Sequence, residues 1–157
     1  MTNAVLICLH LLAAAAWVGG MAAMHFAVRP AAVATLPPPQ RLPFMAAALQ
    51  RFLDGVAWAI ALLLASGFAL IVQRGGFAAL HASAHAMVTI GLVMTAIYLV
   101  IRLRPFPALK RAVAASDWPA GARALDLVRR LVLTNLVLGS AVFGVAIVGP
   151  ALLARPA

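Results

Sequence analysis

Four long apolar stretches dominate this chain. One basic segment lies between the first and second stretches, and another lies between the third and fourth. A helix needs about 20 apolar residues to cross the hydrocarbon core of a bilayer, so each stretch is long enough to span it. The stretches are continuous and do not alternate with polar residues, which excludes a transmembrane β-barrel. The sequence therefore predicts an all-α fold, an integral membrane four-helix bundle, with spans near residues 3–28, 53–73, 79–101 and 131–153.

The composition indicates that lipid surrounds most of the protein. Of the 157 residues, 66% are hydrophobic and only 10% are charged, more apolar surface than a soluble domain of this size can bury. No break in composition divides the chain, so we expect a single membrane domain over 1–157. The net charge of +9 does not indicate a nucleic-acid partner, because the cations lie between apolar runs and form no basic and aromatic surface.

The distribution of the cations predicts the orientation. Ten of the twelve lie between spans one and two or between spans three and four, whereas Arg74 and Arg155 alone lie on the opposite side. Loops rich in Lys and Arg stay in the cytoplasm. We therefore expect a multi-pass protein of the bacterial inner (cytoplasmic) membrane, with both termini on the outer, periplasmic side.

Helices two and four are expected to extend into the cytoplasm. Pro43 suits the first turn of a helix that runs into span two, and the prolines at 37–39 mark the loop before it. Ser116 or Asp117 could cap a helix that starts near Pro119 and leads into span four.

All four histidines fall inside predicted spans, where ionisable residues are costly and usually functional. His10 lies about 10 Å along span one, and His85 about 9 Å along span three, both measured from the outer surface at 1.5 Å per residue. Neutral imidazoles at matching depth on two helices can bind a haem iron from opposite sides. The histidine positions therefore predict one haem b near the outer leaflet, with His10 and His85 as its ligands.

Helix phase predicts that His10 faces the bundle interior. His10, Ala14, Trp17, Met21 and Met24 fall on one stripe of the first helix. Trp17 could pack on the haem ring. The small residues beside this stripe leave room for a macrocycle, but they also allow close helix packing. They therefore do not distinguish a haem-binding helix from one that only packs closely.

His81 precedes His85 by four residues, a spacing that can chelate copper or zinc. His81 could also be the alternate haem ligand or a solvated residue at the outer mouth. A second polar set lies in the inner part of the bundle. It could line a quinone or substrate site, but interfacial anchoring and helix–helix hydrogen bonding are the favoured explanation. Its members are His25, Arg29, Asp54, Tyr98 and Asn135.

Two segments resemble the CopD family of membrane proteins. They are LHLLAAAAWVGGMAAMHFAVRPA in the first span and the long segment HAMVTIGLVMTAIYLVIRLRPFPALKRAVAASDWPAGARALDLVRRLVLTNLVLG. The resemblance implies a role in copper resistance or uptake. The architecture is also similar to HemJ-type protoporphyrinogen oxidase, a haem b protein in which a first-helix histidine precedes a tryptophan, as His10 precedes Trp17. That family has a His-x-Lys-like motif where this chain has His85-Ala86-Met87, and the missing lysine puts the oxidase activity in doubt.

Three functions follow. The first is a haem b protein that transfers electrons, a membrane oxidoreductase that works with quinol or a periplasmic redox partner; a homodimer is compatible with it. The second is copper transport or copper resistance, although the methionines form no ladder in the sequence. The third is a structural subunit without a cofactor. No nucleophile–base triad, phosphate loop or carboxylate pair appears in the sequence, so hydrolytic chemistry is not expected. Candidate copper ligands are His81, His85, Met21, Met24 and His25.

Overall fold

The computed structural model describes residues 2–153, and within this range the chain forms helices and short turns without a β-strand. The all-α prediction is therefore confirmed. The first helix, α1, continues through a π-helical turn, η1, into α2. A short 3-10 turn, η2, lies between α3 and α4. The elements are α1 (Thr2–Ala23), η1 (Met24–Val28), α2 (Arg29–Thr35), α3 (Pro38–Gln73), η2 (Phe77–Ala79), α4 (Ala82–Leu103), α5 (Pro105–Ala114) and α6 (Trp118–Leu153).

Four helical segments are long and apolar enough to cross a membrane, with mean hydropathy of 2.0 to 2.3. At most 22% of the residues in these apolar windows are buried inside the protein. Large apolar side chains point outward instead, and Trp58 on α3 is 80% exposed. Such a surface requires lipid as its solvent. The prediction of a four-helix integral membrane protein is confirmed.

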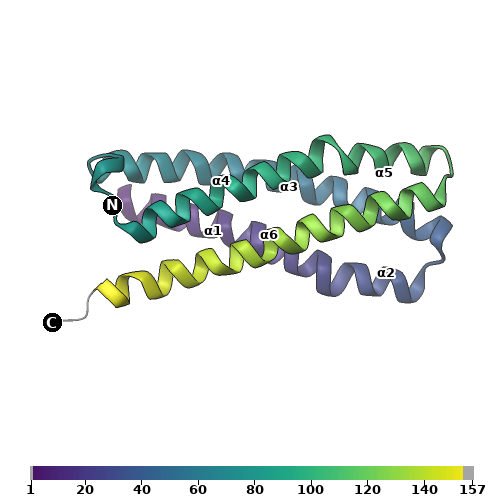
Figure 1. Cartoon of the computed structure of the whole chain (residues 1–157), viewed down its shortest axis with the longest axis horizontal. Helices are drawn as coiled ribbons and strands as arrows, with labels where there is room; N and C mark the ends of the chain where they lie inside the picture. The colour runs from purple at the N-terminus through teal and green to yellow at the C-terminus, as the bar shows by residue number, and fades with distance from the viewer. Residues whose placement is uncertain (1, 154–157) are drawn as a thin grey trace.

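The helices run along one long axis (Figure 1). The beginning of α1, the turn between α3 and α4 and the described end of α6 lie at one end. The turn between α2 and α3, together with α5 and the turn that follows it, lies at the other. α1 packs against α3 and α6, α4 packs against α6, and α5 packs against α6 and α3. The two segments rich in cations therefore share one end. Which end faces the cytoplasm stays a prediction, and Arg155 lies outside the described residues.

α3 and α6 contain 36 residues each, so each is about 54 Å long at 1.5 Å per residue. The hydrocarbon core is about 30 Å thick, and both helices extend well beyond it at the basic end. Asp117 caps α6 as expected, because its Oδ1 accepts a hydrogen bond from the Ala120 N–H at 3.0 Å.

The predicted start of the helix that contains the second span, α3, is wrong by about one turn. α3 begins at Pro38, and Pro43 lies inside it. The prolines at 38 and 39 occupy the first turn, where the backbone N–H groups have no partner within the helix, so proline loses nothing there.

The first span also continues past its predicted end at residue 28. At η1 the Arg29 N–H donates to the carbonyl of Met24, five residues back. Pro30 follows; it has no N–H to donate to the carbonyl of Phe26, and its ring would clash with that carbonyl. The widened π turn relieves this clash and lets α2 follow directly.

α5 is a helix that the sequence analysis did not predict. It follows α4 after a bend at Arg104, and its Phe106 and Leu109 are fully buried. It forms the packed core of the basic end together with Leu42 of α3 and Val128 of α6.

Candidate functional site

His10 is half-buried between α1 and α3. Its Nδ1 lies 2.9 Å from the Ser66 hydroxyl oxygen, and that hydroxyl donates to the Leu62 carbonyl at 2.6 Å. Because the hydroxyl proton is used in this way, Ser66 accepts from His10, which places the imidazole proton on Nδ1. The lone pair of Nε2 is then free to bind a metal.

Gly67 makes room for this imidazole. A Cβ atom at Gly67 would lie 3.2 Å from His10 Cε1, closer than ordinary van der Waals contact. Two consecutive residues of α3 therefore accommodate His10: Ser66 accepts its hydrogen bond, and Gly67 has no side chain that would contact the ring.

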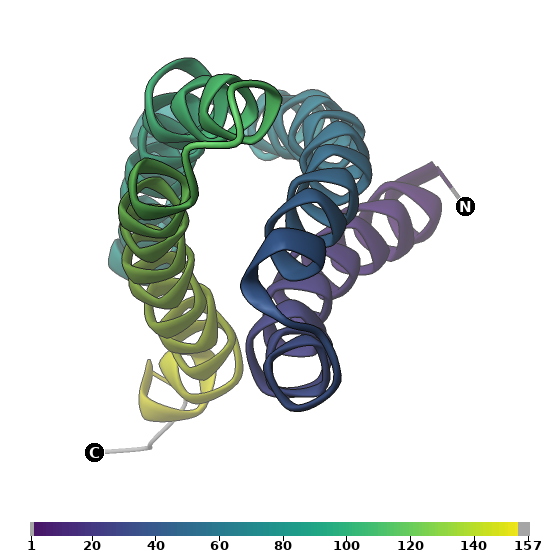
Figure 2. The ribbon, with the colours of Figure 1, turned by 90° about the vertical axis from the view of Figure 1, so that its right-hand side faces the viewer.

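His10 and His85 lie on α1 and α4, two helices that do not pack extensively against each other. His85 is exposed in the first turn of α4, and His81, also exposed, immediately precedes that helix. α4 packs against α6, whereas the beginning of α1 lies on the opposite side of the fold, beside α3 (Figure 2). The haem and its ligand pair stay a prediction. No cluster of three His, Cys, Asp or Glu side chains that could hold a metal occurs in the described part of the chain.

The predicted inward stripe of the first helix is confirmed at Trp17 and Met21, which are 5% and 1% exposed. The structure also gathers methionines in a way that their positions in the sequence did not indicate. Three methionines from three different helices are buried, and Met24 of η1 packs against the core that contains two of them, Met21 and Met94. The buried three are Met21, Met45 and Met94.

A cavity of about 30 Å³ lies between η1, α3 and α6 at the inner part of the bundle. This is the volume of about one water molecule. Met24 and His25 of η1 and Met45 of α3 are among the residues that line it, so two methionines and a histidine come from two elements that are distant in sequence. The remaining lining is two arginines and apolar side chains: Arg29, Arg129, Leu49, Leu125, Val128 and Val132.

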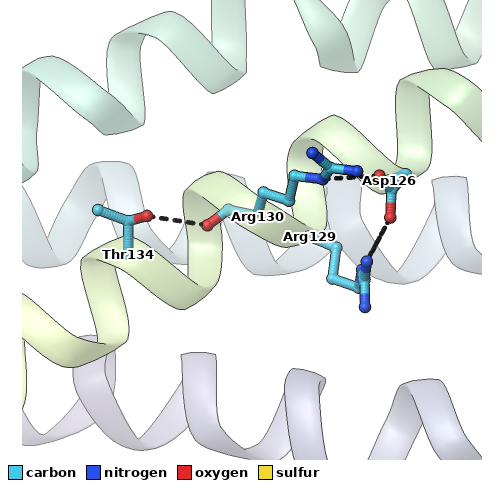
Figure 3. Close-up of polar contacts among 4 residues, drawn as sticks. All are labelled: Asp126, Arg129, Arg130 and Thr134. Atoms are coloured by element: carbon cyan, nitrogen blue, oxygen red, sulfur yellow. Dashed lines mark hydrogen bonds and ion pairs between the residues drawn. The ribbon is translucent and has the colours of Figure 1, made fainter.

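The two arginines differ in their surroundings. Arg129 donates to Asp126 from Nε at 3.0 Å and from Nη2 at 2.5 Å, as Figure 3 shows. The second carboxylate oxygen of Asp126 accepts from Arg130 Nε at 2.8 Å. Asp126 therefore offsets part of the charge of Arg129, because one carboxylate is shared by two arginines. Arg29 has no carboxylate within ion-pair distance among the described residues.

The inner polar set of the sequence analysis is split by the structure. Only His25 and Arg29 reach the cavity. The Tyr98 hydroxyl donates to the Leu53 carbonyl at 3.1 Å, and the Asn135 amide donates to the Met94 carbonyl at 3.0 Å. These two residues link helices, which is the explanation that the sequence analysis favoured.

Asp54, the remaining member, forms an ion pair with Arg102 of α4 at 2.6 Å. It also accepts from Gln50 Nε2 at 2.7 Å. Neither contact is with another member of the set.

The fold and these contacts define a multi-pass membrane protein whose interior carries imidazole and thioether groups. The sequence model of the CopD family, described as copper resistance protein D, matches residues 46–149. This is about two thirds of the chain, and the protein belongs to the CopD family. The predicted resemblance is confirmed, and the similarity to HemJ-type oxidases is not shown. No curated protein and no solved structure matches the chain. The match includes Met94, His81 and His85, and α1 and η1 precede it.

Proposed function

We propose that this protein handles copper within the membrane, in copper resistance or copper transport, and that it binds Cu(I) at the cavity of Met24, His25 and Met45. The convergence of these three side chains on one cavity is the observation that carries the proposal. Thioether sulfur and imidazole are soft and borderline ligands that suit Cu(I) and select against hard cations such as Mg²⁺. The family to which the chain belongs is described as copper resistance protein D.

The size and charge of the cavity suit a passing ion better than a permanently bound one. About 30 Å³ accommodates one ion with its ligands drawn in. All three ligands are neutral, so they do not offset the charge of the ion, and the uncompensated Arg29 opposes it. A transport site has to bind strongly enough to accept the ion and weakly enough to release it.

Two of the proposed ligands lie in the π turn. Met24 continues the inward stripe of α1, and η1 widens the helix from Met24 to Val28. π-helical turns occur frequently at functional sites. Here the turn follows from Pro30, so the sequence feature that distorts the helix lies next to the two proposed ligands.

His10 is the proposed first ligand at the other end of the same helix. Fourteen residues separate it from Met24, which is about 21 Å at the helical rise. Its Nε2 is free, and buried Met21 lies between the two positions. α1 and η1 therefore carry copper-compatible side chains from one end of the span to the other.

Haem-linked electron transfer is the second candidate, and one observation favours it. Histidines that bind metals usually donate their other ring nitrogen to an acceptor, and the Ser66 hydroxyl is such an acceptor for His10. An absorption spectrum separates the candidates, because bound haem gives a Soret band and Cu(I) does not.

The test is an anaerobic Cu(I) titration of the purified full chain against a chromophoric chelator. The variant Met24→Leu/Met45→Leu removes both sulfurs with little change in volume, so folding is retained. Its Cu(I) affinity should fall at least tenfold. Met87→Leu, a half-buried methionine of α4 away from the cavity, should bind as the wild type does. Equal affinity in all three proteins contradicts the proposal.

A further inference from the structure

An open groove of about 290 Å³ lies between α3 and α5 at the basic end of the bundle. Its lining consists mostly of small side chains, which leave the space between the two helices unfilled. A lysine and a glutamine are the only polar residues among those that line it. The residues are Ala46, Ala47 and Gln50 of α3 and Lys110, Val113 and Ala114 of α5.

The groove lies at the level of lipid headgroups. About 20 residues of α3 cross the hydrocarbon core, so a span that ends at Gln73 begins near Leu53. Gln50 is then about 5 Å beyond the hydrocarbon boundary at the helical rise. The headgroup region extends about 5–8 Å on each side of the core, and it therefore contains the part of the groove at Gln50.

Lys110 lines this part of the groove, and Arg51 follows the lining residue Gln50 on α3. Both cations are exposed, and neither forms an ion pair among the described residues. Lys110 Nζ lies 3.4 Å from the Gln50 Oε1, which holds the ammonium group over the groove. Arg51 is exposed and lies one turn from Ala47 on the same side of α3. Asp54 is paired with Arg102 at 2.6 Å, and its carboxylate also interacts electrostatically with Lys110. One carboxylate therefore offsets only part of the positive charge here.

The other two acidic residues of the described chain also have partners elsewhere. Asp126 binds Arg129 and Arg130, and Asp117 caps α6. The groove therefore presents positive charge at the level where phosphate groups lie.

An apolar strip continues from these cations toward the hydrocarbon. Gly55 is one turn beyond Arg51, and a Cβ atom there would meet nothing within 4 Å. Trp58 follows on the same side and is 80% exposed. A cationic end followed by an open apolar strip matches the shape and charge of a phospholipid.

We propose that this groove is a binding site for an anionic phospholipid, with the phosphate between Arg51 and Lys110 and an acyl chain along Gly55 and Trp58. Basic pockets on the cytoplasmic side of membrane helices suit anionic headgroups, and each cation near the surface contributes about 1 kcal/mol. The site is distinct from the copper cavity and does not depend on the copper function.

Native mass spectrometry of the full chain, released from detergent with phosphatidylglycerol or phosphatidylcholine, tests the site. The wild type should retain phosphatidylglycerol in preference to phosphatidylcholine. Arg51→Gln/Lys110→Gln should bind phosphatidylglycerol about tenfold to thirtyfold more weakly. The control Arg41→Gln/Arg123→Gln removes the same charge from the same end, away from the groove, and should bind as the wild type does.

Arg51→Lys/Lys110→Arg keeps both charges and should retain the lipid, which separates loss of charge from loss of fold. Three results would overturn the proposal. They are equal weakening in the control, equal retention of phosphatidylcholine, and displacement of the lipid by millimolar inorganic phosphate, which would indicate a site for the free anion.

Discussion

The Nδ1 atom of His10 lies 2.9 Å from the hydroxyl oxygen of Ser66, across the interface between α1 and α3. This contact joins the first two spans near the end of the bundle where the chain begins. It also assigns the roles of the two imidazole nitrogens, because Nδ1 donates to Ser66 and Nε2 stays free. Both consequences can be measured.

Ser66→Ala should lower the stability of the protein by about 0.5–1.5 kcal/mol, because His10 loses its acceptor in a partly buried position. Ser140→Ala is the matched control. Ser140 also donates to a carbonyl of its own helix, that of Leu136 at 2.9 Å, but it contacts no histidine. Thermal unfolding in detergent should show a lower midpoint for the first variant and little change for the second. Equal shifts would mean that the contact between His10 and Ser66 does not stabilise the fold.

Gly67→Ala should be less stable than Gly91→Ala by about 1 kcal/mol. Alanine is the better helix former at both positions, but only at Gly67 would the new methyl group press on an imidazole, at 3.2 Å from His10 Cε1. At Gly91 nothing lies within 4 Å. The comparison is repeated with His10→Ala, where the difference between the two alanine variants should vanish. A difference that persists without the imidazole would contradict the explanation.

Arg29→Gln should raise the affinity for Cu(I), because it removes the uncompensated positive charge from the cavity lining. A unit charge within several ångströms in a partly buried site contributes about 1 kcal/mol or more, so a gain of fivefold or greater is expected. Arg41→Gln, a cation of α3 that does not line the cavity, should leave the affinity unchanged. The measurement is the same chelator competition, and an unchanged or lower Cu(I) affinity in Arg29→Gln would contradict the repulsion assigned to Arg29.

The membrane topology is tested by cysteine labelling. In a Cys8→Ser background, Lys110→Cys should resist a membrane-impermeant maleimide applied to intact cells and react after lysis, because the cation-rich end is expected in the cytoplasm. Arg74→Cys, in the exposed turn between α3 and α4 at the other end, should react in intact cells. The opposite pattern would reverse the orientation.

The spans could be predicted from the sequence because their length and hydropathy are local properties. The inward stripe at Trp17 and Met21 followed from helix periodicity in the same way. The depth of His10 and His85 along their helices could also be predicted, but depth does not determine where a helix lies around the bundle axis. α1 packs mainly against α3, and α4 packs mainly against α6, so equal depth alone does not show that the two imidazoles face each other.

The cavity could not be predicted, because Met45 reaches Met24 and His25 only through the packing of α3 against the first helix. The π turn is the part for which a signal existed. Pro30 follows Met24 and His25 closely, and a proline inside a predicted helix indicates a local distortion. The sequence analysis already named Met24 and His25 as candidate copper ligands, and this distortion is a second signal at the same residues.

The most direct test of copper binding at the inner cavity is X-ray absorption spectroscopy of the Cu(I)-loaded protein. The proposed site predicts a copper environment with two sulfur neighbours, from Met24 and Met45, and one imidazole nitrogen, from His25, three residues that line the cavity. Met24→Leu/Met45→Leu should lose the sulfur contribution, whereas Met87→Leu should keep it. A spectrum with nitrogen and oxygen neighbours alone, or one unchanged in the double variant, would contradict the account.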